Sequence, residues 1–128
     1  MATSGIPTIT PREAAAATDP STPGDPATRP LIVDVREPNE FATERIEGAV
    51  LIPLSQFAER HAELPQDRPL LMQCHSGSRS SSATVFLLQR GWTDVRNVEG
   101  GIAAWMRDGL PVRTGPPEPG EGELQTGL

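Results

Sequence analysis

The sequence predicts a three-layer α/β/α domain with a five-stranded, mainly parallel central sheet. Apolar runs typical of buried strands alternate along the chain with segments of helical patterning. This alternation favours a parallel sheet with helices on both faces. The 128 residues are enough for one hydrophobic core, so we expect a single domain. In sheets of this kind, ligands bind beyond the carboxyl ends of the strands.

The five expected strands are short apolar runs separated by turn residues. The run Leu-Ile-Val-Asp-Val is almost entirely apolar, which suits a strand buried on both faces. In chain order the expected strands cover residues 6–9, 31–35, 49–52, 70–73 and 94–98.

The expected helices lie between or after these strands. They cover residues 11–17, 38–42, 54–64, 83–90 and 101–109. Thr10 is placed to cap the first helix, and Pro11 stands at its first position. Gly91 is expected to end the fourth helix, and the last should turn Ile102 and Trp105 inward. Trp105 is therefore interpreted as a core anchor and not as a substrate platform.

The chain is expected to divide into a folded part, residues 1–113, and a tail, residues 114–128. Within the folded part, residues 19–30 hold four prolines and a glycine, so they should form a loop. The tail is acidic and rich in proline and glycine, with little to bury. We expect it to be disordered or laid on the surface, and favour this over a partner-binding role.

Composition excludes several classes of function. The net charge of −6, without a basic stripe, argues against a nucleic-acid binder. No apolar run is long enough to cross a bilayer, and the first residues lack the features of a secretory signal. One cysteine rules out an intramolecular disulfide and suits a reducing compartment, so a cytoplasmic protein is expected. His61 and His75 with a single thiol form no recognisable metal set, and no cofactor is expected.

The single cysteine, Cys74, is the main candidate for chemistry. It lies where the fourth expected strand ends and a helix follows, so free amides and the helix dipole should favour its thiolate. The alternative is a small buried hydrophobe, which is what a lone cysteine often is. Gly77 and Arg79 favour the nucleophile, because glycine lets amides turn inward and arginine adds a fixed charge. Ser80 begins a cluster of small residues that can cap the helix.

Three stretches resemble the rhodanese domain of the sulfurtransferase superfamily: residues 31–41 (LIVDVREPNEF), 74–80 (CHSGSRS) and 97–112 (NVEGGIAAW…GLPV). Their order and spacing cover nearly all of the chain outside the tail. The resemblance implies that Cys74 attacks the outer sulfur of thiosulfate or a similar small donor and becomes a persulfide. An acceptor such as cyanide, a thiol or a protein then removes the sulfur. The loop backbone would cradle this anion; its residues are His75, Ser76, Gly77, Ser78 and Arg79.

Two alternatives to a sulfurtransferase stay open. Relatives of the same fold with phosphatase or arsenate-reductase chemistry place the arginine one position farther from the cysteine. Here Arg79 lies five positions after Cys74, a tighter loop that suits a single sulfur atom better than a phosphate. The second alternative is a rhodanese module that carries sulfur to a protein partner, or mainly binds partners, without turnover.

Four further residues are candidates for supporting the site: Ser80, Arg45, Asp34 and Arg36. Asp34 and Arg36 are interpreted mainly as structural charge contacts below the loop. Arg45 stands where the family commonly has histidine and could bring positive charge near the site, although a solvated surface charge is favoured. His75 replaces the arginine usual in the family's loop, which weakens the field toward anionic donors.

Overall fold

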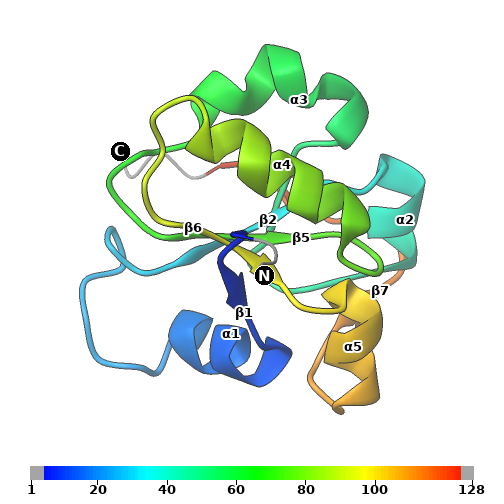
Figure 1. The fold of residues 1–128 in the computed structure, drawn as a ribbon. Helices are drawn as coiled ribbons and strands as arrows, with labels where there is room; N and C mark the ends of the chain where they lie inside the picture. The colour runs from blue at the N-terminus through cyan, green and yellow to red at the C-terminus, as the bar shows by residue number, and fades with distance from the viewer. Residues whose placement is uncertain (1–4, 125–128) are drawn as a thin grey trace.

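The computed structural model describes residues 5–124 and contains the expected five-stranded parallel sheet (Figure 1). All four neighbouring pairs in this sheet are parallel, which confirms the fold class. Several strands are shorter than the apolar runs that predicted them. In order across the sheet they are β1 (Thr8–Ile9), β6 (Val95–Val98), β5 (Leu70–Gln73), β2 (Leu31–Asp34) and β4 (Val50–Leu51).

Helices cover both faces of the sheet, as Figure 1 shows. One face carries α3 (Leu54–Arg60) and α4 (Ser78–Leu88), and the other carries α1 (Pro11–Thr18) and α5 (Gly101–Arg107). The expected helix over residues 54–64 ends at Arg60 and tightens into the 3-10 turn η1 (His61–Glu63). No helix within residues 5–124 is long and apolar enough to cross a membrane.

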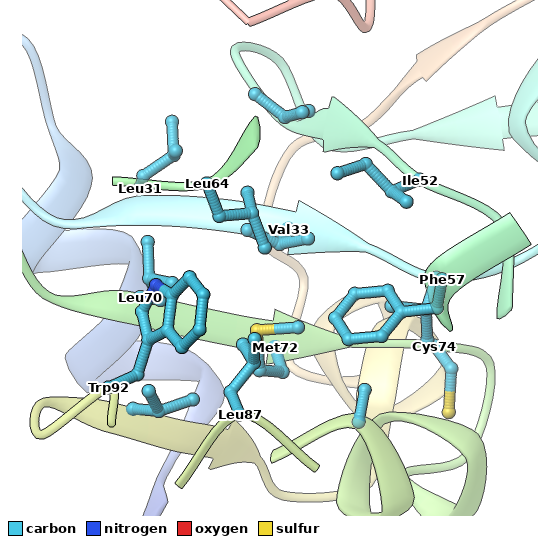
Figure 2. Packing of buried hydrophobic residues seen from close by; sticks show 14 residues of the cluster. Leu31, Val33, Ile52, Phe57, Leu64, Leu70, Met72, Cys74, Leu87 and Trp92 are labelled. Carbon is cyan, nitrogen blue, oxygen red and sulfur yellow. The ribbon is translucent and has the colours of Figure 1, made fainter. Parts of the chain in front are cut away.

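The core consists of two apolar clusters, one on each face of the sheet. Leu70, Met72 and Cys74 point into the cluster under α3 and α4, and Figure 2 shows Cys74 beside Phe57 at the end of the strand. Leu71 points into the other cluster, which also contains Ile102 and Trp105. Because β5 is buried on both faces, its sequence lacks polar alternation, and it delivers Cys74 to the carboxyl edge of the sheet.

A second, two-stranded sheet was not expected from the sequence. After α2 (Pro38–Thr43), β3 (Glu44–Arg45) pairs antiparallel with β7 (Arg113–Thr114). Strands of two residues carry no periodic signal in the sequence, so the pairing could not be recognised there. It brings the segment after α5 back to the helix that follows β2.

Over residues 114–124 the tail lies against the folded part through contacts that the sequence did not indicate. The Leu51 amide donates to the Gly122 carbonyl at 2.8 Å, and Leu124 packs against the core cluster under α3 and α4. The Glu121 carboxylate binds Arg45. The composition of the tail shows that it has few apolar residues, but it does not show which polar and backbone groups the tail can bind. The remainder of the predicted tail, residues 125–128, lies outside the described residues.

Arg45 also differs from the expected solvated charge, since it is 1% exposed. Its guanidinium donates to Glu121 Oε1 at 3.0 Å and to the carbonyl oxygens of Phe41 and Gly115. A buried arginine is stable here because carboxylate and carbonyl oxygens of the tail and of α2 accept hydrogen bonds from its guanidinium. Arg45 therefore connects the C-terminal segment to the end of α2, and the Glu121 carboxylate neutralises its positive charge.

Candidate active site

Cys74 follows β5 directly and opens the loop that leads into α4. Its carbonyl oxygen accepts from the Ile102 amide at 2.8 Å, and the His75 carbonyl accepts from the Ala103 amide at 3.0 Å. The first turn of α5 thus packs beneath the loop backbone. Gly101 permits this approach, because a Cβ at that position would collide with both carbonyl groups. These contacts fix the backbone of Cys74 and leave its side chain directed toward α4.

The sulfur atom of Cys74 is surrounded by hydrogen-bond donors from the start of α4. Its Sγ accepts from the Gly77 amide at 3.1 Å and the Ser80 amide at 3.4 Å, and the Ser80 hydroxyl lies 3.3 Å away. Gly77 has a φ of 105°, a left-handed conformation that turns its amide inward at no steric cost. Gly77 is also the N-cap of α4, which begins at Ser78, ahead of the expected residue 83.

This environment lowers the pKa of the Cys74 thiol. Burial acts in the opposite direction and raises the pKa, since Cys74 is 1% exposed. The hydrogen bonds from the Ser80 hydroxyl and from the amides of Ser80, Gly77 and Ser76 outweigh burial. The net result is a thiol whose ionised form is favoured without a neighbouring general base.

Asn97 of β6 joins the two parts of this donor set and was missed by the sequence analysis. Its Nδ2 donates to the Gly77 carbonyl at 3.1 Å, and its Oδ1 accepts from the Ser80 hydroxyl at 2.6 Å. Since the amide nitrogen faces a carbonyl, the orientation of the side chain is determined. Asn97 is the first residue of the 97–112 motif that resembles the end of the rhodanese domain, but the motif alone does not indicate this contact.

Arg79 does not approach the sulfur as a free cation. Its two terminal nitrogens donate to the two carboxylate oxygens of Glu40, each at 2.8 Å. The bond to Arg79 holds the pKa of Glu40 at about 2, and the carboxylate in turn raises the pKa of Arg79. Glu40 lies on α2, which Figure 1 shows beside the loop that enters α4. Glu40 belongs to the 31–41 motif, but the sequence alone does not indicate its contact with Arg79.

Asp34 and Arg36 form a buried ion pair beneath α2. The Arg36 guanidinium binds Asp34 Oδ2 at 2.9 Å and the Glu44 carboxylate at 3.1 Å. It also donates to the backbone carbonyls of Glu44 at 2.7 Å and Glu40 at 3.3 Å. Arg36 thus connects the end of β2 to the end of α2, the structural type of contact that the sequence favoured for this pair.

The structure brings some of the sequence-predicted residues to the sulfur and leaves others apart. Gly77 and Ser80 bind it directly. The Ser76 amide also favours the thiolate, whereas the side chains of His75, Ser76 and Ser78 are exposed on the outer side of the loop. Backbone amides and a hydroxyl at the start of α4 can therefore hold an anionic sulfur. The exposed side chains of His75, Ser76 and Ser78 line the solvent side of the loop.

Comparison with known proteins points to one family of domains. Residues 16–108 match the family model of the rhodanese-like domain. The chain is similar to a sulfurtransferase of Allochromatium vinosum, with 43% identity over 82 residues that cover 64% of this chain and 77% of the relative. It is also 32% identical to the thiosulfate sulfurtransferase GlpE of Actinobacillus succinogenes, over 66% of this chain and 76% of that protein.

Solved structures and longer relatives extend the comparison. A rhodanese-related protein from Thermoplasma volcanium superposes with a TM-score of 0.73 at 30% identity, covering 84% of this chain and 97% of that one. The chain spans only 21% of the probable adenylyltransferase/sulfurtransferase MoeZ of Mycobacterium tuberculosis, at 39% identity. The same kind of domain therefore occurs both as nearly a whole protein and as a small part of a longer one.

Proposed function

The chain belongs to the rhodanese-like domain family, and we propose that it is a sulfurtransferase whose Cys74 carries sulfane sulfur as a persulfide. The single observation that carries the persulfide step is the convergence of two amides and a hydroxyl on Cys74 Sγ. Donors in this arrangement stabilise the attacking thiolate, and they suit the outer sulfur of a persulfide, which is also an anion. The names of the similar proteins support sulfur transfer as the general reaction.

In the first half-reaction the Cys74 thiolate attacks the outer sulfur of the donor. With thiosulfate, the bond between Sγ and that sulfur forms, and the bond between the two donor sulfurs breaks. Sulfite leaves with the electron pair of the broken bond, and Cys74 retains one negative charge as the persulfide anion. No proton moves, which fits a site whose thiol pKa is lowered by hydrogen bonds and not by a general base.

In the second half-reaction an acceptor attacks the outer sulfur of the Cys74 persulfide. Cyanide forms a carbon–sulfur bond and leaves as thiocyanate, whereas an acceptor thiolate leaves as a new persulfide. In each case the sulfur–sulfur bond to Cys74 breaks, and its electron pair returns to Sγ as the thiolate. The amides of Gly77 and Ser80 then hold the same anion as at the start of the cycle.

A protein acceptor is a second candidate, and the exposure of the loop supports it. His75, Ser76 and Ser78 face solvent around a buried sulfur, so a partner surface can reach the loop without displacing the core. A carrier of this kind would accept sulfur on Cys74 but release it slowly to small nucleophiles.

Steady-state kinetics test the proposal. With thiosulfate and cyanide varied together, thiocyanate formation should give parallel double-reciprocal lines, and the Cys74→Ser variant should give none. Sulfur loading without turnover would favour the carrier. Hydrolysis of aryl phosphates by Cys74 without any sulfur loading would overturn both candidates.

A further inference from the structure

The ion pair between Arg79 and Glu40 removes the one arginine of the 74–80 loop from anion binding. Each terminal nitrogen of Arg79 donates to one carboxylate oxygen of Glu40 at 2.8 Å. This bidentate geometry satisfies the guanidinium and the carboxylate together. Their side chains are partly exposed, at 33% and 29%, so the pair lies at the solvent side of the loop. A donor that approaches Cys74 therefore meets a neutralised pair and not a free cation.

Glu40 is held in this position by contacts independent of Arg79. Its Oε1 also accepts from the Glu37 amide at 3.0 Å, which caps α2. Its backbone carbonyl accepts from Arg36, which is buried against Asp34. With its pKa at about 2, Glu40 remains a carboxylate throughout the pH range in which a thiolate forms. The negative charge beside the loop is thus fixed in place and in ionisation state.

The donors around the sulfur match one negative charge. The amides of Gly77 and Ser80 and the Ser80 hydroxyl suit the single charge that Cys74 carries both as thiolate and as persulfide anion. Thiosulfate would bring two further negative charges to a site whose arginine is already bound to a carboxylate. A persulfide with no other charge would bring at most one.

We propose that Glu40 is a specificity-determining residue, which by occupying Arg79 selects against dianionic donors and in favour of organic persulfides that carry no charge beyond that of the persulfide group. The proposal rests on the sulfurtransferase function and names its donor class. The Cys74 thiolate attacks the outer sulfur of R–S–SH, the new sulfur–sulfur bond forms, and R–S⁻ leaves with the electron pair of the old bond. The proton stays on the transferred sulfur or passes to water.

The Glu40→Gln variant tests this role with little structural change. Glutamine keeps an oxygen for the Glu37 amide, as a capping box allows, but removes the charge and frees part of the Arg79 fork. For thiosulfate, kcat/KM should rise about tenfold, mainly through a lower KM, as one like charge beside a dianion is removed. For the persulfide of 2-mercaptoethanol, kcat/KM should change less than about twofold.

Glu37→Gln is the matched control, because it removes the same charge from the N-cap residue of the same helix. The Glu37 carboxylate contacts Ser55 and not Arg79, so the ratio of kcat/KM for the two donors should stay near that of the wild type. A higher KM for thiosulfate in Glu40→Gln would mean that Glu40 holds Arg79 in place for anion binding, and would overturn the proposal. An unchanged ratio would overturn it as well.

Ionic strength provides a test that needs no variant. If Glu40 neutralises Arg79 so that the loop offers dianions no attraction, added KCl should not lower wild-type kcat/KM for thiosulfate, and a decrease would contradict the proposal. The sulfurtransferase function and the role of Glu40 are contradicted by different results. If neither donor loads sulfur on Cys74, the sulfurtransferase function fails. If both load it with unchanged preference in Glu40→Gln, only the role of Glu40 fails.

Discussion

The Ser80 hydroxyl donates to Asn97 Oδ1 at 2.6 Å while its oxygen lies 3.3 Å from Cys74 Sγ. A hydroxyl has one proton, so it can donate to only one of these acceptors at a time. With Cys74 protonated, the thiol can donate to Ser80 and Ser80 to Asn97. With Cys74 ionised, the Ser80 proton can turn to the thiolate, which is the stronger acceptor. The pair therefore links the ionisation of the nucleophile to a side chain on the neighbouring strand.

Replacing Ser80 with alanine should raise the pKa of Cys74. The variant loses the hydroxyl that favours the thiolate and keeps the backbone donors, so the pKa of the thiol should rise. The pH dependence of the alkylation rate of the thiol measures it. Ser82→Ala is the control, because that hydroxyl bonds only the Ser78 carbonyl among the described contacts. Equal pKa values in Ser80→Ala and the wild type would contradict the assigned role of Ser80.

Replacing Asn97 with aspartate should raise the same pKa further than Ser80→Ala does. A carboxylate still accepts from Ser80, but it adds a like charge near the thiolate and cannot donate to the Gly77 carbonyl. The alkylation profile of this variant gives the comparison. Asn97→Asp with a thiol pKa at or below that of Ser80→Ala would show that Asn97 does not communicate with the sulfur.

Replacing Arg36 with alanine should destabilise the fold strongly. The change leaves the buried Asp34 carboxylate without its partner, a defect that costs about 3–5 kcal/mol of unfolding free energy. Urea unfolding measures this loss. Arg96→Ala is the control, since Arg96 is exposed and its ion pair with Asp94 is long, at 4.0 Å. That control should stay within about 0.5 kcal/mol of the wild type. An equally small loss of unfolding free energy in Arg36→Ala would contradict a stabilising role for the buried ion pair beneath α2.

The bond between Arg45 and Glu121 should make stability depend on pH in acid. Arg45 lowers the pKa of Glu121 from 4.5 to about 2, so the carboxylate stabilises the fold above pH 4.5. This contribution is lost as the pH falls through the folded-state value near 2. The wild type should be more stable than Glu121→Gln at pH 6, and the difference should shrink between pH 4.5 and 2. A difference that is constant over that range would contradict the shift.

Local patterns in the sequence were sufficient for most of the fold. Apolar runs and helical periodicity located the five parallel strands and the helices on both faces, because burial on both sides of a parallel sheet leaves a continuous apolar signal. The β3–β7 pair and the individual contacts of the tail were not indicated. Their contacts join residues far apart in the chain, such as Arg45 and Glu121, and composition does not report such pairs.

The candidate site shows the same division. Cys74, Gly77 and Ser80 lie within one short motif, so their proximity followed from the sequence. Asn97 and Glu40 reach the loop from other elements, and nothing local to those residues indicates the contact. The positive charge of Arg79 was visible in the sequence, but its neutralisation by Glu40 depends on the position of α2.

Intact mass spectrometry tests the central claim most directly. The wild type, incubated with thiosulfate or with the persulfide of 2-mercaptoethanol, should gain the mass of one sulfur atom. Cyanide should then remove that mass and release an equal amount of thiocyanate, and Cys74→Ser should show neither change. Sulfur loading that persists in Cys74→Ser, or a wild type that gains no sulfur from either donor, would contradict a persulfide on Cys74.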